Sequence, residues 1–505
     1  MVDAILTAFV NLADIKIIGL IIGGVAIGMM GGALPGISPS ITIALLLPIS
    51  FSMDPLYGLV ALGAVYMSAE YGGSISAILI NTPGTAAAVC TALDGHPLAR
   101  KGRAQEALHA AILGSSVGGF IGVVILLLFT PPLAEMSLKF QGPEMFWLAI
   151  AGLAIVCNLT ADNFIKGLTA AFLGLFISTI GYDNFTGVPR FAYDIPEIEA
   201  RVHIVPAIIG FFAIPYMLDL VGAKDRKAAE VTPQPGSFGR MVKYMWDNPV
   251  LVIRSGLIGT FVGILPGAGA SIASFVSYSE AKRFSKTPEE FGKGTPEGII
   301  ASECANNAMV GGSLVPLLSF GIPGSASAAV LFGAVMLYGM TPGPRMFTEH
   351  ADVVYGFMVS FIPIVIAMLI VGATLAPVFA KVLKVRMAYT VSTVLVLALI
   401  GSYTIQSSIV DIYIAATLGV VGFLMMKLGF SLAPIVLGLI LGPMAEEGFR
   451  RSFIIAEAEQ ASVFLMFFGR PICIILILVV VLMVGTAFWQ EYKGKKRLAS
   501  LVSGH

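Results

Sequence analysis

Two glutamates interrupt long apolar stretches of this chain. Glu70 stands in VYMSAEYGGS and Glu303 in IIASECANNAMVGGS. An acid at the depth of a lipid bilayer costs roughly 2.5–3.5 kcal/mol on insertion scales, so it normally faces a cavity or a partner. Glu70 and Glu303 therefore either become protonated and take part in ion coupling, or they make structural hydrogen bonds to neighbouring helices. Asn306 and Asn307, about one turn beyond Glu303, make this region more polar and are candidate substrate ligands.

A second set of polar residues surrounds a Pro-Gly pair at the end of an apolar segment, AILINTPGT. Pro83 has no backbone N–H and Gly84 tolerates unusual dihedral angles, so a helix must end here. In hydrocarbon, the freed backbone groups have to be buried in protein or face a water-filled cavity. Asn81, Thr82 and Thr85 place amide and hydroxyl groups beside the break. We treat these five residues as candidate substrate ligands.

The segment SFGIPGSAS, which begins at Ser319, has the same arrangement. Its candidate substrate ligands are Pro323, Gly324, Ser325 and Ser327. After each Pro-Gly pair an apolar run of small residues resumes, which predicts a helix N-terminus suited to a carboxylate. The carbonyl groups at the preceding helix ends suit Na⁺, so we expect candidate sodium positions near Asn81 and Ser319. A proline kink satisfied by neighbouring helices is the alternative, but two motifs at matching positions favour a binding site.

A Leu-Pro-Gly motif occurs twice, in GALPGISPSIT from Gly32 and in GILPGAGASIA from Gly263. Each copy ends one apolar run and opens a short one. Ser38, Ser40 and Ser271 are candidate substrate ligands, with close packing of small residues as an equally open alternative. Gly-xxx-Gly spacings such as Gly19/Gly23, Gly24/Gly28 and Gly28/Gly32 are assigned to helix packing. Asp94, which precedes Gly95-His96-Pro97, is expected to serve as a cap or in a turn.

The low content of charged residues indicates that lipid covers most of the surface of this chain, including the helices that carry these residues. The 505 residues are 57% hydrophobic and 12% charged, whereas soluble proteins carry about 25% charged residues. The net charge is zero, so nothing suggests a nucleic-acid partner. Runs at 37–50 and 268–279 are too short for the ~20 residues of a spanning helix, which predicts half-helices or re-entrant segments. The other apolar runs lie near 15–34, 56–80, 106–130, 143–158, 164–180, 204–221, 250–265, 297–320, 325–340, 353–380, 388–402, 409–428, 432–444 and 465–489.

The two halves carry the same anchors in the same order. Besides the Leu-Pro-Gly and Pro-Gly motifs, Gly72-Gly73 corresponds to Gly311-Gly312, and the 206–215 segment to 434–443. This pairing sets Glu70 opposite Met309, so the two acids do not align. Loop 50–55 has no basic residue, whereas its counterpart after 279 has four; corresponding loops thus carry opposite charge bias. Because basic residues favour the cytoplasmic side, the halves are expected to be inverted.

We therefore predict an all-α polytopic membrane protein with two inverted-topology repeats, discontinuous or re-entrant helices, and one extra C-terminal helix. The first repeat spans 1–222, a cytoplasmic linker 223–249, the second repeat 250–450, and the extra helix with a cytoplasmic tail 451–505. The polar insert at 182–202 is expected to face outside, as a plain loop or as a docking surface. Inverted repeats with Pro-Gly interruptions are typical of alternating-access transporters. Glu303 and Glu70 would then couple transport to Na⁺ or H⁺.

Two other classes of function remain as alternatives. An ion or anion channel usually needs a symmetric pore with repeated selectivity residues. An intramembrane enzyme would use Glu70 and Glu303 as an acid pair, but no spacing of nucleophile and base supports it. The sequence has no GxxxxGK[ST] loop for ATP, and it indicates no cofactor other than a coupling ion.

Several ordered motifs resemble a known family. GGALPGISPSITIALLLPISF, YGGSISAILINTPGTAAAVCTALDGHPLARKGRAQEAL, GILPGAGASIASFVSYSEAKR, ECANNAMVGGSLVPLLSFGIPGS and APIVLGLILGP together resemble the large membrane subunit of tripartite tricarboxylate transporters, over about residues 15–450. The resemblance implies a secondary transporter of the bacterial inner membrane that imports carboxylates such as citrate. It also implies two partners, a small four-helix membrane subunit and a periplasmic solute-binding protein.

Overall fold

The computed structural model describes residues 12, 14–160, 163–183, 185–193, 196–199, 202–221, 236–383 and 385–502. Almost all of them are helical, as the apolar runs predict. The first half contains α2 Ile15–Ala33, α3 Pro39–Phe51, α4 Pro55–Ile80, α5 Ala88–Leu98, the π-helical turn Ala99–Arg103, α6 Ala104–Ser137, α7 Gly142–Thr160, α8 Phe164–Ser178, β1 Gly181–Tyr182, β2 Pro189–Arg190, α9 Pro196–Glu199, α10 Ile204–Phe212 and α11 Ile214–Asp219.

The described elements of the second half are all helices, joined by short loops. It contains α12 Ser237–Asp247, α13 Pro249–Ile264, α14 Gly269–Phe284, the 3₁₀ turn Pro288–Glu290, α15 Pro296–Phe320, α16 Ala326–Leu337, α17 Met346–Glu349, α18 Ala351–Val382, α19 Met387–Gln406, α20 Ile409–Lys427, α21 Ala433–Ala458, α22 Val463–Phe468 and α23 Pro471–Val502.

Six helices of the described part are long and apolar enough to cross a membrane. They are Ile15–Ala33, Ala88–Ser137, Ala351–Leu375, Met387–Thr404, Ile409–Lys427 and Pro471–Trp489. A multi-pass membrane protein is the class to which such a set of helices belongs. The short runs predicted as half-helices form α3, with 13 residues, and α14, with 16 residues.

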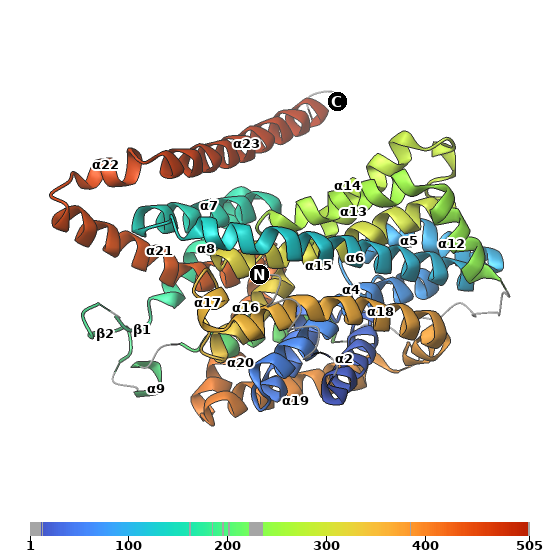
Figure 1. Ribbon diagram of the computed structural model, residues 1–505, viewed down its shortest axis with the longest axis horizontal. Coiled ribbons are helices and arrows are strands. Elements are labelled where there is room, and N and C mark those ends of the chain that lie inside the picture. The colour runs from blue at the N-terminus through green and yellow to red at the C-terminus, as the bar shows by residue number, and fades with distance from the viewer. Residues whose placement is uncertain are drawn as a thin grey trace.

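The centre of the molecule is built from helices of both halves. α6 packs along α15, α2 along α4, and α13 along α15. In Figure 1, α6 and α15 run through the middle of an elongated body, with α7, α8 and α21 toward one end and α12, α13 and α14 toward the other. α23 lies along the outside of this body and contacts α7. Only 11% of its Pro471–Trp489 stretch is buried, so most of this apolar helix faces the surroundings of the chain.

Two helices extend beyond the apolar runs. α12 lies inside the 223–249 segment, which is expected to be a cytoplasmic linker. α21 continues past the apolar run 432–444 and past residue 450, because Glu446–Arg450 and Glu447–Arg451 pairs one helical turn apart favour further helix. Outside these helices, β1 and β2, with two residues each, form an antiparallel pair within the polar insert.

The insert is fixed to α21 by ion pairs. Arg190 donates to both carboxylate oxygens of Glu446, at 2.8 and 3.1 Å, and Arg450 lies 2.9 Å from Asp183. The Phe185 backbone N–H, together with the Thr186 hydroxyl and Arg450, lowers the pKa of Asp183 to about 2. The described part of the insert is therefore a folded element, not a plain loop.

Because the folded-state pKa of Asp183 lies below its unfolded value of about 3.9, its anchoring is complete above that value and is lost as the pH falls toward 2. We expect pepsin to cleave within 185–199 slowly at pH ~4 and quickly at pH ~2. The Asp183→Asn variant should be cleaved quickly at both. Glu199→Gln removes only the charge of an exposed acceptor of the Tyr182 hydroxyl and should keep the wild-type profile. Identical profiles for wild type and Asp183→Asn would contradict this role.

Candidate functional site

The first Pro-Gly break lies where the sequence places it. α4 ends at Ile80, and Asn81 takes a left-handed conformation with φ of 52°. The chain then folds back, so that the Gly84 N–H donates to the Gly73 carbonyl at 3.3 Å. Thr85 is buried, and its hydroxyl accepts the Ala88 N–H at 3.3 Å, at the start of α5. The predicted helix end and helix N-terminus are both confirmed here.

The second break has the same design. α15 ends at Phe320, and Gly321 is left-handed with φ of 74°. The Gly324 N–H donates to the Ser313 carbonyl at 3.3 Å. The Ser325 hydroxyl caps α16 by accepting the Ala328 N–H at 3.0 Å. Ser325 and Ser327 are 4% and 5% exposed, so this helix N-terminus lies inside the protein.

Each Pro-Gly loop is pressed against the helix end that precedes a Leu-Pro-Gly motif. A Cβ atom on Gly84 would collide with the Gly32 carbonyl oxygen at the end of α2. A Cβ atom on Gly324 would collide with the Gly263 carbonyl oxygen at the end of α13. The structure therefore brings the two motifs of each half together, which their separation in sequence does not reveal.

The serines of the first Leu-Pro-Gly motif bond to their own segment. The Ser38 hydroxyl accepts the Ile41 N–H at 3.4 Å and lies 2.8 Å from the Ser40 hydroxyl. These contacts cap the N-terminal end of α3. They therefore give the two serines a structural role. Ser271 is partly exposed in the first turn of α14.

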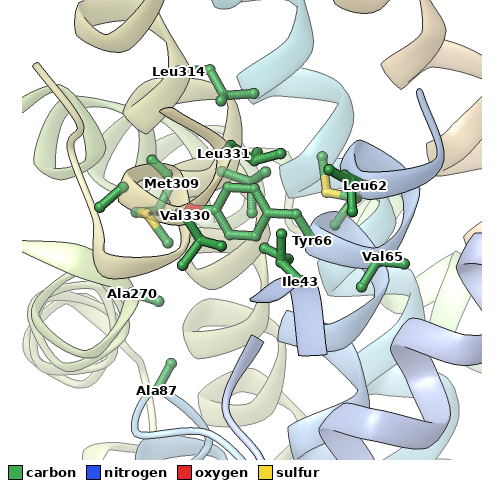
Figure 2. Packing of buried hydrophobic residues seen from close by; sticks show 14 of the residues in the cluster. Ile43, Leu62, Val65, Tyr66, Ala87, Ala270, Met309, Leu314, Val330 and Leu331 are labelled. Carbon is green, nitrogen blue, oxygen red and sulfur yellow. Dashed lines mark hydrogen bonds between the residues drawn. The ribbon is translucent and has the colours of Figure 1, made fainter. Parts of the chain in front are cut away.

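Tyr66 joins the second break to α4 of the first half, a link that the sequence reasoning missed. Its hydroxyl lies 3.0 Å from the Ser313 hydroxyl and 2.6 Å from the Ser325 hydroxyl. Figure 2 shows the Tyr66 ring extending toward Met309, with Ile43 among the apolar side chains around it. The sequence does contain a signal for this contact, a tyrosine within a run of mostly small and apolar residues. The hydroxyl of a buried tyrosine needs a hydrogen-bond partner, so such a residue indicates a contact with a polar group of another element.

Glu303 is held by hydroxyl groups from two other helices. Thr91 of α5 donates to one carboxylate oxygen, and Ser115 of α6 donates to the other at 2.9 Å. Glu70 of α4 lies within electrostatic range of Glu303. Both acids are buried, with exposed fractions of 4% for Glu70 and 0% for Glu303. Two acids that do not match in the sequence repeat thus lie near each other in space.

Asn306 and Asn307 bind the backbone of α4. The Asn306 amide donates to the Glu70 carbonyl at 3.1 Å, and the Asn307 amide donates to the Met67 carbonyl at 2.8 Å. Their amide oxygens are buried and have no hydrogen-bond partner among the residues that the structure describes. Both side chains therefore lie near the two acids, and the amide oxygen of each is available to accept a further contact.

The contacts between α4 and α15 show that these helices run antiparallel. Asn306 meets Glu70, whereas Met309, further along α15, meets Tyr66, earlier in α4. Asn81 follows the C-terminal end of α4 and Ser319 lies near the C-terminal end of α15, so they lie near opposite ends of this pair. A helix rises about 1.5 Å per residue, so the two candidate sodium positions are separate sites. The Ser319 hydroxyl itself donates to the Thr130 carbonyl at 3.1 Å.

Asp94 caps a helix N-terminus, as expected for a cap, but the helix belongs to the other half. Its Oδ1 accepts the backbone N–H groups of Gly292, Gly294 and Thr295 at 2.9, 2.8 and 3.1 Å. Its Oδ2 accepts the Tyr278 hydroxyl at 2.8 Å. The carboxylate is fully buried, so it binds α5 to the start of α15.

This arrangement suits the binding of small anions and cations better than bond-breaking chemistry. Two loops present helix N-termini: the one at Ser325 is buried, whereas the first loop has Asn81 exposed and Thr82 and Pro83 partly exposed. Two buried acids with amide and hydroxyl groups lie on the helices that end at these loops. Among the described residues, no group of three or more His, Cys, Asp or Glu side chains is placed to hold a metal ion. The four cysteines, Cys90, Cys157, Cys304 and Cys473, are free and buried.

Comparisons with known proteins place the chain in a family. The model of the tripartite tricarboxylate transporter TctA family matches residues 18–437. An uncharacterised 52.8 kDa protein of the TAR-I ttuC' 3' region of Agrobacterium vitis is 36% identical over 483 residues, which cover 94% of this chain and 93% of that protein. An uncharacterised protein of the TAR-II ttuC' 3' region of the same organism is 37% identical over 206 residues, or 41% of this chain and 85% of that protein. No solved structure matches.

The matched region contains both Pro-Gly breaks, Glu70, Glu303 and α5, so the family match covers the residues of the candidate site. It ends before α22 and α23. The long apolar helices agree with a transmembrane protein. This chain belongs to the tripartite tricarboxylate transporter TctA family, and it is a transmembrane transport protein, not an enzyme.

Proposed function

We propose that the chain is the large transmembrane subunit of a binding-protein-dependent secondary transporter, which imports tricarboxylates or related carboxylates by ion-gradient-driven alternating access. The observation that carries the proposal is the pair of Pro-Gly loops that open buried helix N-termini at Thr85 and Ser325. Unpaired N–H groups and the positive end of the helix dipole suit carboxylate groups. The cargo would be bound by helix ends, amides and hydroxyls from both halves.

Matched packing supports two structurally related halves. In the first half, Cβ atoms on Gly28 and Gly32 would meet the carbonyl oxygens of Val65 and Ala69. In the second half, Cβ atoms on Gly259 and Gly263 would meet the carbonyl oxygens of Ala305 and Met309. These contacts make Ala69 the counterpart of Met309, so Glu70 corresponds to Val310. The sequence alignment based on the Gly-Gly motifs pairs Glu70 with Met309, so it differs by one residue from the correspondence that these contacts support.

The distribution of basic residues at the helix ends supports an inverted orientation of the two halves. Basic residues collect at one end, where Lys101 donates to the Lys293 carbonyl at 2.7 Å and Arg240 lies 3.6 Å from Glu106. We place this end in the cytoplasm. The α13–α14 hairpin then enters from the cytoplasm, and the α2–α3 hairpin enters from outside together with the insert. The test is a Lys293→Cys variant in intact cells. Labelling of this cysteine by a thiol reagent that does not cross the membrane, added from outside, would contradict this topology.

The transport proposal also includes two partners and a coupling ion. The partners are a small four-helix membrane subunit and a periplasmic solute-binding protein in the bacterial inner membrane. Glu303 and Glu70 are the proposed ion-coupling acids, with Na⁺ or H⁺ as the ion. The test is uptake of labelled di- and tricarboxylates into proteoliposomes that contain the assembled complex, under imposed Na⁺ and H⁺ gradients. Uptake at full rate without the binding protein, or without any gradient, would contradict the proposal.

Substrate binding at the two breaks predicts that Ser325→Ala and Asn81→Gly abolish uptake while the complex still assembles. Glycine is the informative replacement at Asn81, because it keeps the left-handed conformation and removes only the amide. Thr169→Ala, which removes an exposed hydroxyl from α8, is the matched control and should transport normally. Normal uptake by both site variants would remove these residues from the substrate site.

A further inference from the structure

We infer that Glu70, Tyr71, Glu303, Asn306 and Asn307 form a binding site for a sodium ion where α4 crosses α15. The inference deepens the proposed function, and its role in coupling rests on that function. Ion binding itself is measured without transport. All five side chains are at most 4% exposed, and they come from both halves of the chain.

Unused hydrogen-bond acceptors are the first observation. The amide nitrogens of Asn306 and Asn307 donate to backbone carbonyl oxygens of α4 at 3.1 and 2.8 Å. In this orientation both amide oxygens are buried and find no donor among the described residues. The Tyr71 hydroxyl is also buried, with no partner in the described part of the chain. Buried polar atoms in native proteins almost always have a partner, so this group points to a ligand that supplies positive charge.

The second observation is that two buried acids have no basic partner among the described residues. Glu303 is oriented by the hydroxyls of Thr91 and Ser115, and the Asn306 side chain also interacts with it. The Glu70 carboxyl group lies within electrostatic range of Glu303, so the two repel each other when both are ionised. In the described part of the chain, no lysine, arginine or histidine forms an ion pair with either acid. A buried charge needs such compensation, and a bound cation provides it.

The donor set selects the kind of cation. Every unused atom is an oxygen, and oxygen ligands favour hard cations over transition metals. Only two carboxylates are present, and one is already held by two hydroxyls, which favours a monovalent ion over Ca²⁺ or Mg²⁺. A proton bound to Glu70 would give a donor to one amide oxygen and leave the other unpaired. A sodium ion contacts several oxygens at once.

The position of this site connects it to the second break. Glu70 lies one helical turn beyond Tyr66 on α4, so both side chains face the same side of the helix. Tyr66 contacts the cap of α16 through Ser325. Sodium bound between Glu70, Asn306 and Asn307 fixes α4 against α15 and thereby fixes the Tyr66 hydroxyl at the substrate loop. The ion would order the substrate site before the carboxylate binds.

The test is thermal unfolding of the purified full-length chain, titrated with NaCl while choline chloride keeps the ionic strength constant. We expect a saturable stabilisation by Na⁺ that KCl does not reproduce. Asn306→Ala and Asn307→Ala should each raise the half-saturating Na⁺ concentration by about tenfold or more. Asn306→Asp keeps an oxygen ligand and should retain the response. Asn158→Ala, which removes a membrane asparagine that bonds α7 to α23, is the matched control and should titrate like wild type.

Equal stability of the wild type in Na⁺, K⁺ and choline would overturn the sodium site. Stabilisation by acidification alone would replace sodium by a proton. An unchanged half-saturating concentration in both alanine variants would overturn this set of ligands. If the alanine variants fail to purify, the wild type and Asn306→Asp still decide the question. Sodium stabilisation without carboxylate uptake would count against the proposed transport and leave the ion site standing.

Discussion

Replacing Gly84 or Gly324 by alanine is expected to abolish uptake and to lower the thermal stability of the chain. The added methyl group would lie on the Gly32 carbonyl oxygen in the first variant and on the Gly263 carbonyl oxygen in the second. A backbone oxygen at a helix end has no rotamer by which to move away. The cost is about 3 kcal/mol or more, at the upper end of the range for overpacked cores. Unfolding temperature in detergent and uptake in proteoliposomes measure the two effects.

Gly23→Ala is the matched control for this substitution. Gly23 belongs to a Gly-xxx-Gly pair assigned to packing, but no described residue of a neighbouring element lies within 4 Å of a Cβ placed there or on Gly19. Within the described part of the chain, the packing assignment holds for Gly24, Gly28 and Gly32, which face α4. Alanine at position 23 should be tolerated or slightly stabilising. A normal unfolding temperature and normal uptake for Gly84→Ala would show that its loop does not need the close approach.

Asp94→Ala is expected to have the second largest effect, a marked loss of stability with loss of uptake. The variant leaves the N–H groups of Gly292, Gly294 and Thr295 and the Tyr278 hydroxyl without their acceptor. An unpaired buried donor costs about 1–3 kcal/mol, so four of them cost about 3 kcal/mol or more even if some find other partners. Hydrogen–deuterium exchange should increase at 292–298, and the unfolding temperature should fall.

Asp219→Asn is the control for the loss of an aspartate charge. Asp219 pairs with Lys427 at 2.6 Å, but both side chains are about half exposed. Exposed pairs contribute about 0.2–1 kcal/mol, so this variant should differ little from wild type. Asp94→Asn should fall between the two, because its amide oxygen still accepts hydrogen bonds. If exchange at 292–298 is unchanged in Asp94→Ala, the carboxylate does not hold that loop.

Local chemistry made the helix ends predictable from the sequence. Pro83-Gly84 and Pro323-Gly324 stop α4 and α15, and the small residues after them start α5 and α16. The shortness of α3 and α14 followed from the length of their apolar runs. These features depend on residues that are close in sequence, so no knowledge of the tertiary structure was needed.

The contacts between the halves were not predictable in the same way. Tyr66 reaches Ser325, and Thr91 reaches Glu303, across long separations in sequence. Helix periodicity does not choose the partner of a helix that is apolar on all sides, because every face can be buried. Asp94 illustrates this limit, since the sequence indicated a cap but the capped helix is α15.

The dependence of α15 on both α5 and α6 has a consequence for biogenesis. α6 presents Ser115 and a seam of glycines that fit only against α15, which is synthesised much later. Asp94 likewise cannot accept its three backbone hydrogen bonds until the 292–295 loop has been synthesised. Until those residues leave the ribosome, the first half must remain in the bilayer with polar groups unpaired. The newly made N-terminal half is therefore an incomplete intermediate that depends on the insertion machinery, and not a domain that matures by itself.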